Sequence, residues 1–260
     1  ENMKKHISFS EVKIWDECPF KHKLQYVDKI NKFIGNEYTA FGKALHEACE
    51  KSLLDNNSLV DDVFTRSFLK ELKHLKSEDV ELRSSLVLDM AEQGKILANK
   101  VLPAVKEYFS EYKVHAAEEQ LYEPISKMDY NFKGYVDLIL KTKEGKYHII
   151  DWKTCSWGWD SRKKADRMIN YQLVYYKHFF AQKHKIDPKN IETYFALLKR
   201  TAKKNRIEIF RTTSGDKKTQ NSLKLLNNSI YNIKKGNYIK NRTSCTQGYG
   251  CEFYKTKHCP

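Results

Sequence analysis

Two acidic residues and a lysine occur in neighbouring apolar segments of the chain, where charged side chains are unusual. Asp137 lies in Gly134–Leu140, and Asp151 and Lys153 lie in His148–Thr154. A charge inside an apolar strand is costly unless it is paired or binds a cation. Two carboxylates brought together could hold one divalent metal ion, and such an ion can lower the pKa of a bound water.

The two segments have the pattern of a β-hairpin. Both are rich in β-branched residues, and Lys143–Lys146 between them is a polar, glycine-containing turn signal. The hairpin would place Asp137, Asp151 and Lys153 on neighbouring strands, close enough to share one cation. For the hairpin alone, the alternative is that Asp137 faces solvent at a strand edge and that Asp151 and Lys153 form a surface pair.

Composition favours a protein with a substantial core and an anionic partner. The 260 residues are 40% hydrophobic and 13% aromatic. The formal net charge of +14 favours a polyanion, with a merely basic, lysine-rich surface as the alternative. No apolar run approaches membrane-spanning length, and Met3–Phe9 lacks the apolar centre of a signal peptide. We therefore expect a cytoplasmic protein with free thiols and no membrane partner.

Helical patterns dominate the first part of the chain and strand patterns the middle. Ser8 precedes Glu11 at capping-box spacing and predicts the start of a helix. Pro103 is expected to kink or split a later helix. The other expected helices cover residues 38–54, 59–76, 79–113, 160–183 and 213–235. The expected strands cover residues 117–125, 130–141, 146–153, 191–198 and 206–211.

These elements predict one α/β domain spanning residues 1–260. We expect a helical lobe over residues 47–113, placed before the core strands. A catalytic core over 114–200 follows, and an irregular, cysteine-bearing tail covers 236–260.

Two of the predicted helices carry polar side chains one turn apart. His46 and Glu50 are separated by four residues and therefore share a helix face. Gln172 and Tyr176 have the same spacing in a later helix. A lone helical histidine is more often an ordinary surface or core residue than a ligand, so the spacing alone assigns no role.

Taken in order, these motifs resemble the RecB-like branch of the PD-(D/E)xK nuclease superfamily. The motifs are Gly42-x-x-x-His46, Gly134-Tyr-Val-Asp137, Asp151-Trp-Lys153-Thr154 and Gln172-x-x-x-Tyr176. The branch includes nuclease domains of bacterial recombination helicases, CRISPR-adaptation nucleases, phage exonucleases and the mitochondrial genome maintenance exonuclease. Val136 stands where the family name has proline, and the second acid is aspartate rather than glutamate, which is equivalent for a hard cation.

The resemblance implies a restriction-endonuclease-like core, in which helices flank a mixed central sheet. It also implies a metal-dependent DNA exonuclease that acts on single strands or DNA ends, in replication, recombination or phage genome processing. A structure-specific endonuclease of the same fold is one alternative. A non-catalytic nucleic-acid-binding module is another, although such a protein has no physical reason to keep the full set of catalytic residues.

By the same resemblance, Mg²⁺ or Mn²⁺ is held by Asp137, Asp151, His46 and the backbone carbonyl of Trp152. An imidazole ligand makes Mn²⁺ a good activator. Lys153 would stabilise charge on the phosphoryl group or orient the attacking water.

Three further residues are candidates for supporting roles. Gln172 and Tyr176 correspond to a pair that positions the lysine, the water or a phosphate. Glu119, on the strand before the hairpin, is a weaker candidate for an outer-shell ligand, with a solvated carboxylate as the alternative.

Aromatic and basic residues alternate directly after the Asp151-Trp-Lys153 motif. Stacking and phosphate pairing would suit a single strand threaded past the site. The alternative is that the tryptophans pack in the core and the charges form a solvated helix face. The candidates for DNA contact are Trp157, Trp159, Arg162, Lys163, Lys164 and Arg167.

Four of the six cysteines lie near the two ends of the chain, at Cys18, Cys245, Cys251 and Cys259. Many RecB-like nucleases bind a [4Fe–4S] cluster with one N-terminal and three C-terminal cysteines, so the resemblance implies a cluster here. The spacing C-x5-C-x7-C departs from the usual C-x2-C-x5-C. Bound zinc and free cysteines are the alternatives.

Overall fold

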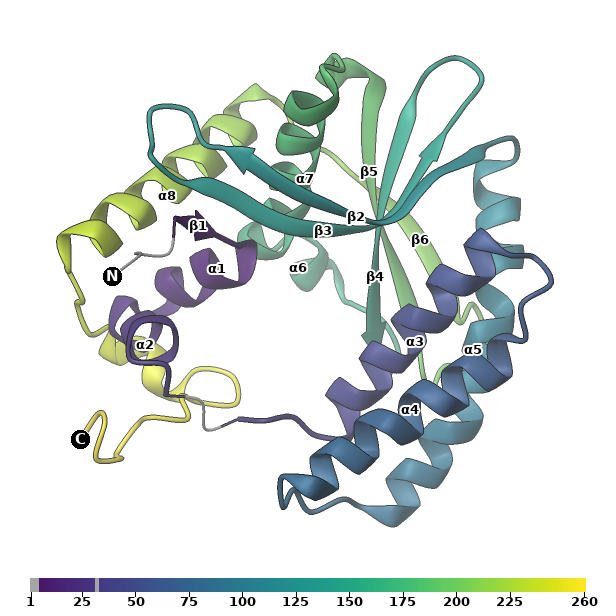
Figure 1. The fold of residues 1–260 in the computed structure, drawn as a ribbon, viewed down its shortest axis with the longest axis horizontal. Coiled ribbons are helices and arrows are strands. Elements are labelled where there is room, and N and C mark those ends of the chain that lie inside the picture. The colour runs from purple at the N-terminus through teal and green to yellow at the C-terminus, as the bar shows by residue number, and fades with distance from the viewer. Residues whose placement is uncertain (1–4, 31–32) are drawn as a thin grey trace. The chain divides into compact units, whose positions relative to one another are not determined.

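The computed structural model describes residues 5–30 and 33–260, whose contacts divide the chain into two units (Figure 1). The first unit combines the described part of Glu1–Phe33 with Leu121–Gly134 and Ser214–Pro260. The second combines Ile34–Gln120 with Tyr135–Thr213. The predicted catalytic residues all belong to the second unit, and the four terminal cysteines all belong to the first. Within the described residues, no helix has both the length and the apolarity that a membrane crossing requires.

The predicted hairpin is present in the second unit. Strand β3 (Asn131–Lys141) runs antiparallel to β4 (Tyr147–Cys155), with Leu138 opposite Ile150. The turn is closed by a hydrogen bond from the Thr142 amide to the Lys146 carbonyl at 2.9 Å. Alternating side chains of β4 therefore point to opposite faces of the sheet.

Two more strands extend this hairpin into the central mixed sheet that the sequence predicts. Strand β5 (Ile191–Lys199) is parallel to β4, and β6 (Ile207–Thr212) is antiparallel to β5. Strand β2 (Lys113–Pro124) pairs with β3. It begins at Lys113, four residues before the predicted start, because the preceding helix ends earlier than its periodicity suggested.

Three helices ahead of the core strands pack against one another and are called the lobe below. They are α3 (Glu37–Leu54), α4 (Val60–Ser77) and α5 (Ser84–Phe109). Asn36 caps α3 by accepting a hydrogen bond from the Thr39 amide at 3.0 Å. The predicted split at Pro103 is absent, because α5 continues through the proline and is held by buried side chains on both sides of it.

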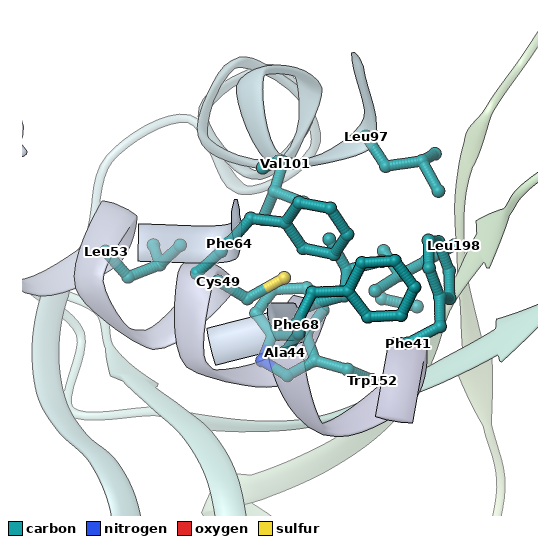
Figure 2. Close-up of a cluster of buried hydrophobic side chains, with 14 of the residues drawn as sticks. Phe41, Ala44, Cys49, Leu53, Phe64, Phe68, Leu97, Val101, Trp152 and Leu198 are labelled. Carbon is teal, nitrogen blue, oxygen red and sulfur yellow. The ribbon is translucent and has the colours of Figure 1, made fainter. Parts of the chain in front are cut away.

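The lobe and the sheet share one hydrophobic core (Figure 2). The Phe41 and Phe64 rings meet edge to face at 5.7 Å, and Phe64 stacks on Phe68 at 5.4 Å. Trp152 of β4, which follows the catalytic candidate Asp151, is buried in the same cluster. The lobe thus anchors the strand that carries the predicted catalytic residues.

The helix expected over residues 160–183 forms as two helices. Helix α6 (Ser161–Lys164) is followed by α7 (Arg167–His184), and Asp166 caps α7 by accepting from the Ile169 amide at 3.0 Å. The cap provides a new helix start that apolar periodicity cannot reveal. Helix α7 packs against β4 and β5, and a short 3₁₀ turn, η2 (Pro188–Asn190), leads into β5.

The first unit contains the two ends of the chain. Ser8 caps α1 as predicted, by accepting a hydrogen bond from the Glu11 amide at 3.3 Å. The tail from Gly236 on is irregular, as expected, apart from one 3₁₀ turn. This unit includes parts of β2 and β3. Its other elements are β1 (His6–Ile7), α1 (Phe9–Glu17), α2 (Pro19–His22), the π-helical η1 (Lys23–Val27), α8 (Asp216–Lys235) and η3 (Arg242–Thr246).

Candidate active site

The hairpin brings the two predicted catalytic carboxylates, Asp137 and Asp151, together. The observed register, continued one step beyond the Leu138–Ile150 pair, places Asp137 opposite Asp151. Burial, and then the negative charge of Asp151, raise the pKa of Asp137 well above its ordinary value. Two carboxylates held this close in a water-poor site repel each other unless a proton or a cation lies between them.

His46 and the backbone of Trp152 complete this group. The Oδ2 atom of Asp137 accepts a hydrogen bond from the Trp152 amide at 2.9 Å, and its Oδ1 lies 3.7 Å from Nδ1 of His46. His46 also hydrogen-bonds to the Trp152 backbone, and burial lowers its pKa. Its neutral form, which is the form that binds metals, is therefore favoured. The structure thus brings together all four predicted ligands of the metal ion.

The donor set fits a divalent cation. It offers hard carboxylate oxygens with one imidazole, which suits Mg²⁺ or Mn²⁺. Asp151 is only 3% exposed, and among the described residues its buried Oδ2 takes part in no hydrogen bond of proper geometry, although the Lys153 ammonium lies beside it. An acceptor in this situation has capacity left for a further positive partner.

Lys153 is held between the sheet and α7. Its Nζ lies 2.9 Å from Oδ2 of Asp151 and donates a hydrogen bond to Oε1 of Gln172 at 2.8 Å. Gln172 in turn donates from Nε2 to the hydroxyl oxygen of Tyr176 at 3.2 Å. Burial raises the pKa of Tyr176, so its hydroxyl keeps its proton. The motif on α7 therefore fixes the position of the lysine.

A cavity of about 510 Å³ opens beside the predicted metal ligands. His46, Asp137 and Trp152 contribute to its wall, and Lys43 and Lys51 add positive charge. The volume is sufficient for a hydrated cation together with a phosphate group, and the lysines are suited to the phosphate.

Three carboxylates of this cavity were not among the predicted site residues, namely Glu47, Glu50 and Glu118. Burial, and then the charge of Glu118 and a hydrogen bond with it, raise the pKa of Glu50. The spacing of four from His46 already placed Glu50 on the correct helix face, but nothing in the sequence pattern indicated Glu118.

Glu119, the predicted outer-shell ligand, lies in a different environment. Its Oε2 is 2.9 Å from Nε2 of His184, and its Oε1 is 3.5 Å from Nε2 of His115. The reason is local. Glu118 has a φ of +58°, and the alternation of burial along β2 is interrupted at Ala116 and Ala117. The left-handed residue bends the strand at this point, and Glu118 and Glu119, as adjacent residues, point to different neighbours.

The DNA-contact candidates fall into two groups. Trp157 is 78% exposed, whereas Trp159 packs edge to face on Phe195 at 5.1 Å. Trp159 is thus partly buried against the sheet, whereas Trp157 is open to solvent. Among the basic residues, Arg162 is exposed on α6.

The other three basic candidates have protein partners. The Lys163 ammonium lies 5.1 Å from the Trp159 ring, and Lys164 forms an ion pair with Glu208 at 2.6 Å. The Arg167 guanidinium lies 5.6 Å from the Tyr171 ring. These contacts reduce what the three residues can offer to a phosphate.

The four terminal cysteines surround one small cavity in the first unit. All are free thiols. The Asn241 amide donates to Sγ of Cys18 at 3.3 Å, and the Arg242 guanidinium donates to Sγ of Cys259 at 3.9 Å. Over residues 5–30 and 33–260, however, no three of these thiols belong to a group spaced to share a single metal ion.

The chain was compared with protein families, curated proteins and solved structures. A sequence model of the family described as the PD-(D/E)XK nuclease superfamily matches residues 6–259. The crystal structure of a "Putative exonuclease" from Eubacterium rectale is similar, with a TM-score of 0.57 and 14% identity, over 89% of this chain and 82% of that chain. The crystal structure of SSO0001 matches with a TM-score of 0.37 and 16% identity, over 88% of this chain and 90% of that chain. No curated protein matches the sequence.

The likeness to the Eubacterium rectale protein shows the fold, a mixed α/β core with its central sheet flanked by helices, as predicted from the sequence. The family match spans almost the whole chain and includes every residue of the carboxylate, histidine and lysine group. Nucleases of this kind use a divalent metal and act on nucleic acid. This chain belongs to the PD-(D/E)XK nuclease superfamily.

Proposed function

We propose that the protein is a divalent-metal-dependent DNA exonuclease of the RecB-like branch, acting on single-stranded DNA or DNA ends in replication, recombination or phage genome processing. The observation that carries the proposal is the convergence of His46, Asp137, Asp151 and Lys153 beside one open cavity. Each has the residue type, position and neighbours that phosphodiester hydrolysis needs.

His46, Asp137, Asp151 and the Trp152 carbonyl would hold Mg²⁺ or Mn²⁺. When bound, such an ion offsets charge on the phosphoryl oxygens and lowers the pKa of a water molecule. The neutral imidazole of His46 contributes a ligand without adding charge. Asp137 and Asp151 bring the negative charge that makes the site selective for cations.

The remaining roles belong to Lys153 and its partners. Lys153 would donate from its ammonium to a phosphoryl oxygen, where negative charge develops during cleavage. Gln172 holds the ammonium at 2.8 Å, so that little reorganisation is needed when substrate arrives. Tyr176 orients Gln172 through the bond at 3.2 Å.

A preference for single strands is supported by Trp157. An indole that is 78% exposed, on the loop directly after β4, is available to stack on an unpaired base. The exposed Arg162 nearby in the sequence can pair with a phosphate. Exonuclease activity, rather than internal cleavage, is supported by the motif order of the RecB-like branch.

We further propose that Cys18, Cys245, Cys251 and Cys259 hold a [4Fe–4S] cluster. Their convergence on one cavity and the two donors to sulfur support this, because hydrogen bonds to sulfur stabilise thiolates. A cluster contains several irons and spaces its thiolates farther apart than a single ion does.

The nuclease proposal is tested with end-labelled linear and circular single-stranded DNA, each with Mg²⁺, Mn²⁺ or chelator. We expect stepwise shortening of the linear strand with either metal, no cleavage of the circle, and no activity with chelator. The Asp151→Asn variant should lose at least about a thousandfold in rate, while Asp187→Asn, a surface control, should not. Cleavage of the circle would indicate the endonuclease alternative, and binding without cleavage the non-catalytic one.

A further inference from the structure

We propose that His115, Glu119 and His184 form a second cation site, suited to Zn²⁺ and separate from the catalytic carboxylates. The three side chains come from the middle of β2 and from the last residue of α7. The proposal rests on the geometry of this cluster and not on nuclease activity.

The spacing of the ligand atoms matches a small coordination sphere. One ligand atom from each of the three residues lies within 4.8 Å of the other two. Nε2 of His184 is 2.9 Å from one oxygen of Glu119, and Nε2 of His115 is 3.5 Å from the other. Zinc binds nitrogen and oxygen ligands at about 2.0–2.2 Å, so tetrahedral ligand atoms lie roughly 3.3–3.6 Å apart. Small side-chain rotations would therefore be sufficient to surround an ion.

The chemistry of the donors selects the kind of ion. Two imidazoles and one carboxylate are a borderline-soft set that binds Zn²⁺ much better than Mg²⁺. The side chains of His115 and His184 are both 28% exposed, and that of Glu119 is 12% exposed. Such partial burial leaves a coordination position open for water, as three-ligand zinc sites require.

Aromatic contacts hold the two imidazoles in place. His115 meets Tyr147 edge to face at 5.5 Å and Phe180 at 5.9 Å. His184 lies against the same Phe180 ring at 4.5 Å. The rings of His115 and His184 are nearly perpendicular, with centroids 5.4 Å apart. Because these contacts restrict the rings before any ion binds, less conformational entropy is lost on binding.

One neighbour opposes the site, namely Lys183. Its ammonium lies 3.5 Å from Oε2 of Glu119 and donates to the Gln120 carbonyl at 2.9 Å. A cation bound to Glu119 would be repelled by this charge, so Lys183 must swing into solvent, and its side chain is already 34% exposed. Because the ammonium competes with the ion for Glu119, the proposal predicts that removing the lysine charge strengthens metal binding.

An ion at this site would connect β2 to the end of α7. It would therefore stabilise the folded chain, because binding free energy at a site formed only on folding adds to folding free energy. Helix C-termini also favour positive charge, which adds to the attraction at His184.

The test measures Zn²⁺ binding by the full chain with saturating Mg²⁺, in an Asp151→Asn background that removes turnover and weakens the catalytic site. Co²⁺ serves as a spectroscopic probe, because binding to the terminal cysteines would give thiolate-to-cobalt charge-transfer bands and binding to His and Glu would not. We expect one ion without such bands, and a thermal midpoint that rises when it binds.

The variants are chosen so that the fold is kept. Glu119→Gln retains a hydrogen-bonding group beside His184, and His115→Ala lies at a partly exposed position. Each should weaken this ion at least tenfold, whereas His74→Ala, an exposed control on α4, should not. Lys183→Gln should bind the ion severalfold more tightly.

Equal Zn²⁺ stoichiometry and affinity in the parent protein and in both ligand variants would overturn the proposal. Unchanged affinity in Lys183→Gln would overturn the placement of the ion at Glu119. Since no DNA is present in these measurements, failure of the zinc site and failure of the nuclease proposal are distinguishable.

Discussion

Gln172 fixes the ammonium of Lys153, because its Oε1 accepts a hydrogen bond from the lysine Nζ at 2.8 Å. Lys153 extends from the sheet and Gln172 from α7, so the helix determines where the lysine charge lies. The second contact, from Lys153 to Asp151 at 2.9 Å, would by itself let the ammonium move around the carboxylate.

Replacing Gln172 with alanine should therefore reduce catalysis more than substrate binding. Misplacement of a catalytic group by about 1 Å can cost roughly a hundredfold in rate. We expect kcat to fall by about ten- to a hundredfold with KM nearly unchanged, measured with a short labelled strand. The control is Gln220→Ala on α8, which is exposed. An increase in KM alone would mean that Gln172 binds substrate and does not position Lys153.

His46→Ala should weaken metal binding. The variant loses an imidazole that lies 3.7 Å from Asp137 but keeps both carboxylates, so we expect a higher metal requirement and partial recovery of activity at high Mn²⁺. Activity is titrated against Mg²⁺ and Mn²⁺ separately, with His74→Ala as the control. An unchanged metal dependence would show that His46 is not a ligand.

The raised pKa of Asp137 predicts how the stability of the metal-free protein depends on pH. Because the folded pKa lies above that of the unfolded chain, the folded state binds more protons between the two values. The free energy of unfolding should therefore fall as pH rises through this range. The Asp137→Asn variant should not show this decrease in the free energy of unfolding. In chelator at neutral pH it should therefore be more stable than the parent protein.

When metal is present, the order of stability of the parent protein and Asp137→Asn should be reversed. A bound cation makes the ionised Asp137 favourable, so the parent should then unfold at the higher temperature. Thermal midpoints are measured across pH with chelator and with Mn²⁺. If Asp137→Asn is less stable than the parent in both conditions, the two carboxylates do not repel each other as their positions indicate.

Trp157→Ala should weaken binding to single-stranded DNA. Base stacking on an aromatic side chain is worth about 1–3 kcal/mol, or roughly five- to 150-fold in affinity. The slope of affinity against salt should stay the same, because no charge is removed, while Arg162→Ala should reduce the slope. Tyr231, 56% exposed on α8, provides an aromatic control. Equal affinity of Trp157→Ala and the parent would remove Trp157 from the binding surface.

Cys251→Ser should lower thermal stability more than catalytic rate. A cluster held by the four cysteines would connect α1 to the C-terminal tail, and its binding free energy would contribute to folding. Protein purified without oxygen should be brown and contain iron, and the variant should lose iron. A colourless parent without iron or zinc, together with a variant that melts normally, would exclude the cluster and leave the nuclease proposal intact.

The parts of the site that depend on regular geometry could be predicted from the sequence. Two apolar, β-branched runs and a glycine-containing turn between them predicted the hairpin, and the hairpin places Asp137 near Asp151. Spacing by four predicted the shared helix face of Gln172 and Tyr176, which the hydrogen bond at 3.2 Å confirms. Both inferences use repeats that every strand and every α-helix obey.

The parts that depend on local departures from these repeats could not be predicted. Asp166 begins a new helix where periodicity predicted a continuous one. Glu118, in its left-handed conformation, lines the cavity that Glu119 was expected to approach. A non-glycine residue with positive φ carries no composition signal, because the surrounding structure and not the residue type imposes it. The division of the contacts into two units likewise depends on pairings between distant segments.

The conformation of Glu118 also bears on how relatives of this protein should be compared. Two adjacent carboxylates of β2 belong to different sites, one at the catalytic cavity and one between two histidines. Adjacent side chains of a strand point to opposite faces, so loss or gain of a single codon ahead of them would exchange the two, whereas most substitutions there would not. A one-residue gap here in an alignment of relatives would therefore change which site each acid belongs to. Acidic residues on the two sides of such a gap should not be matched merely because both are acidic.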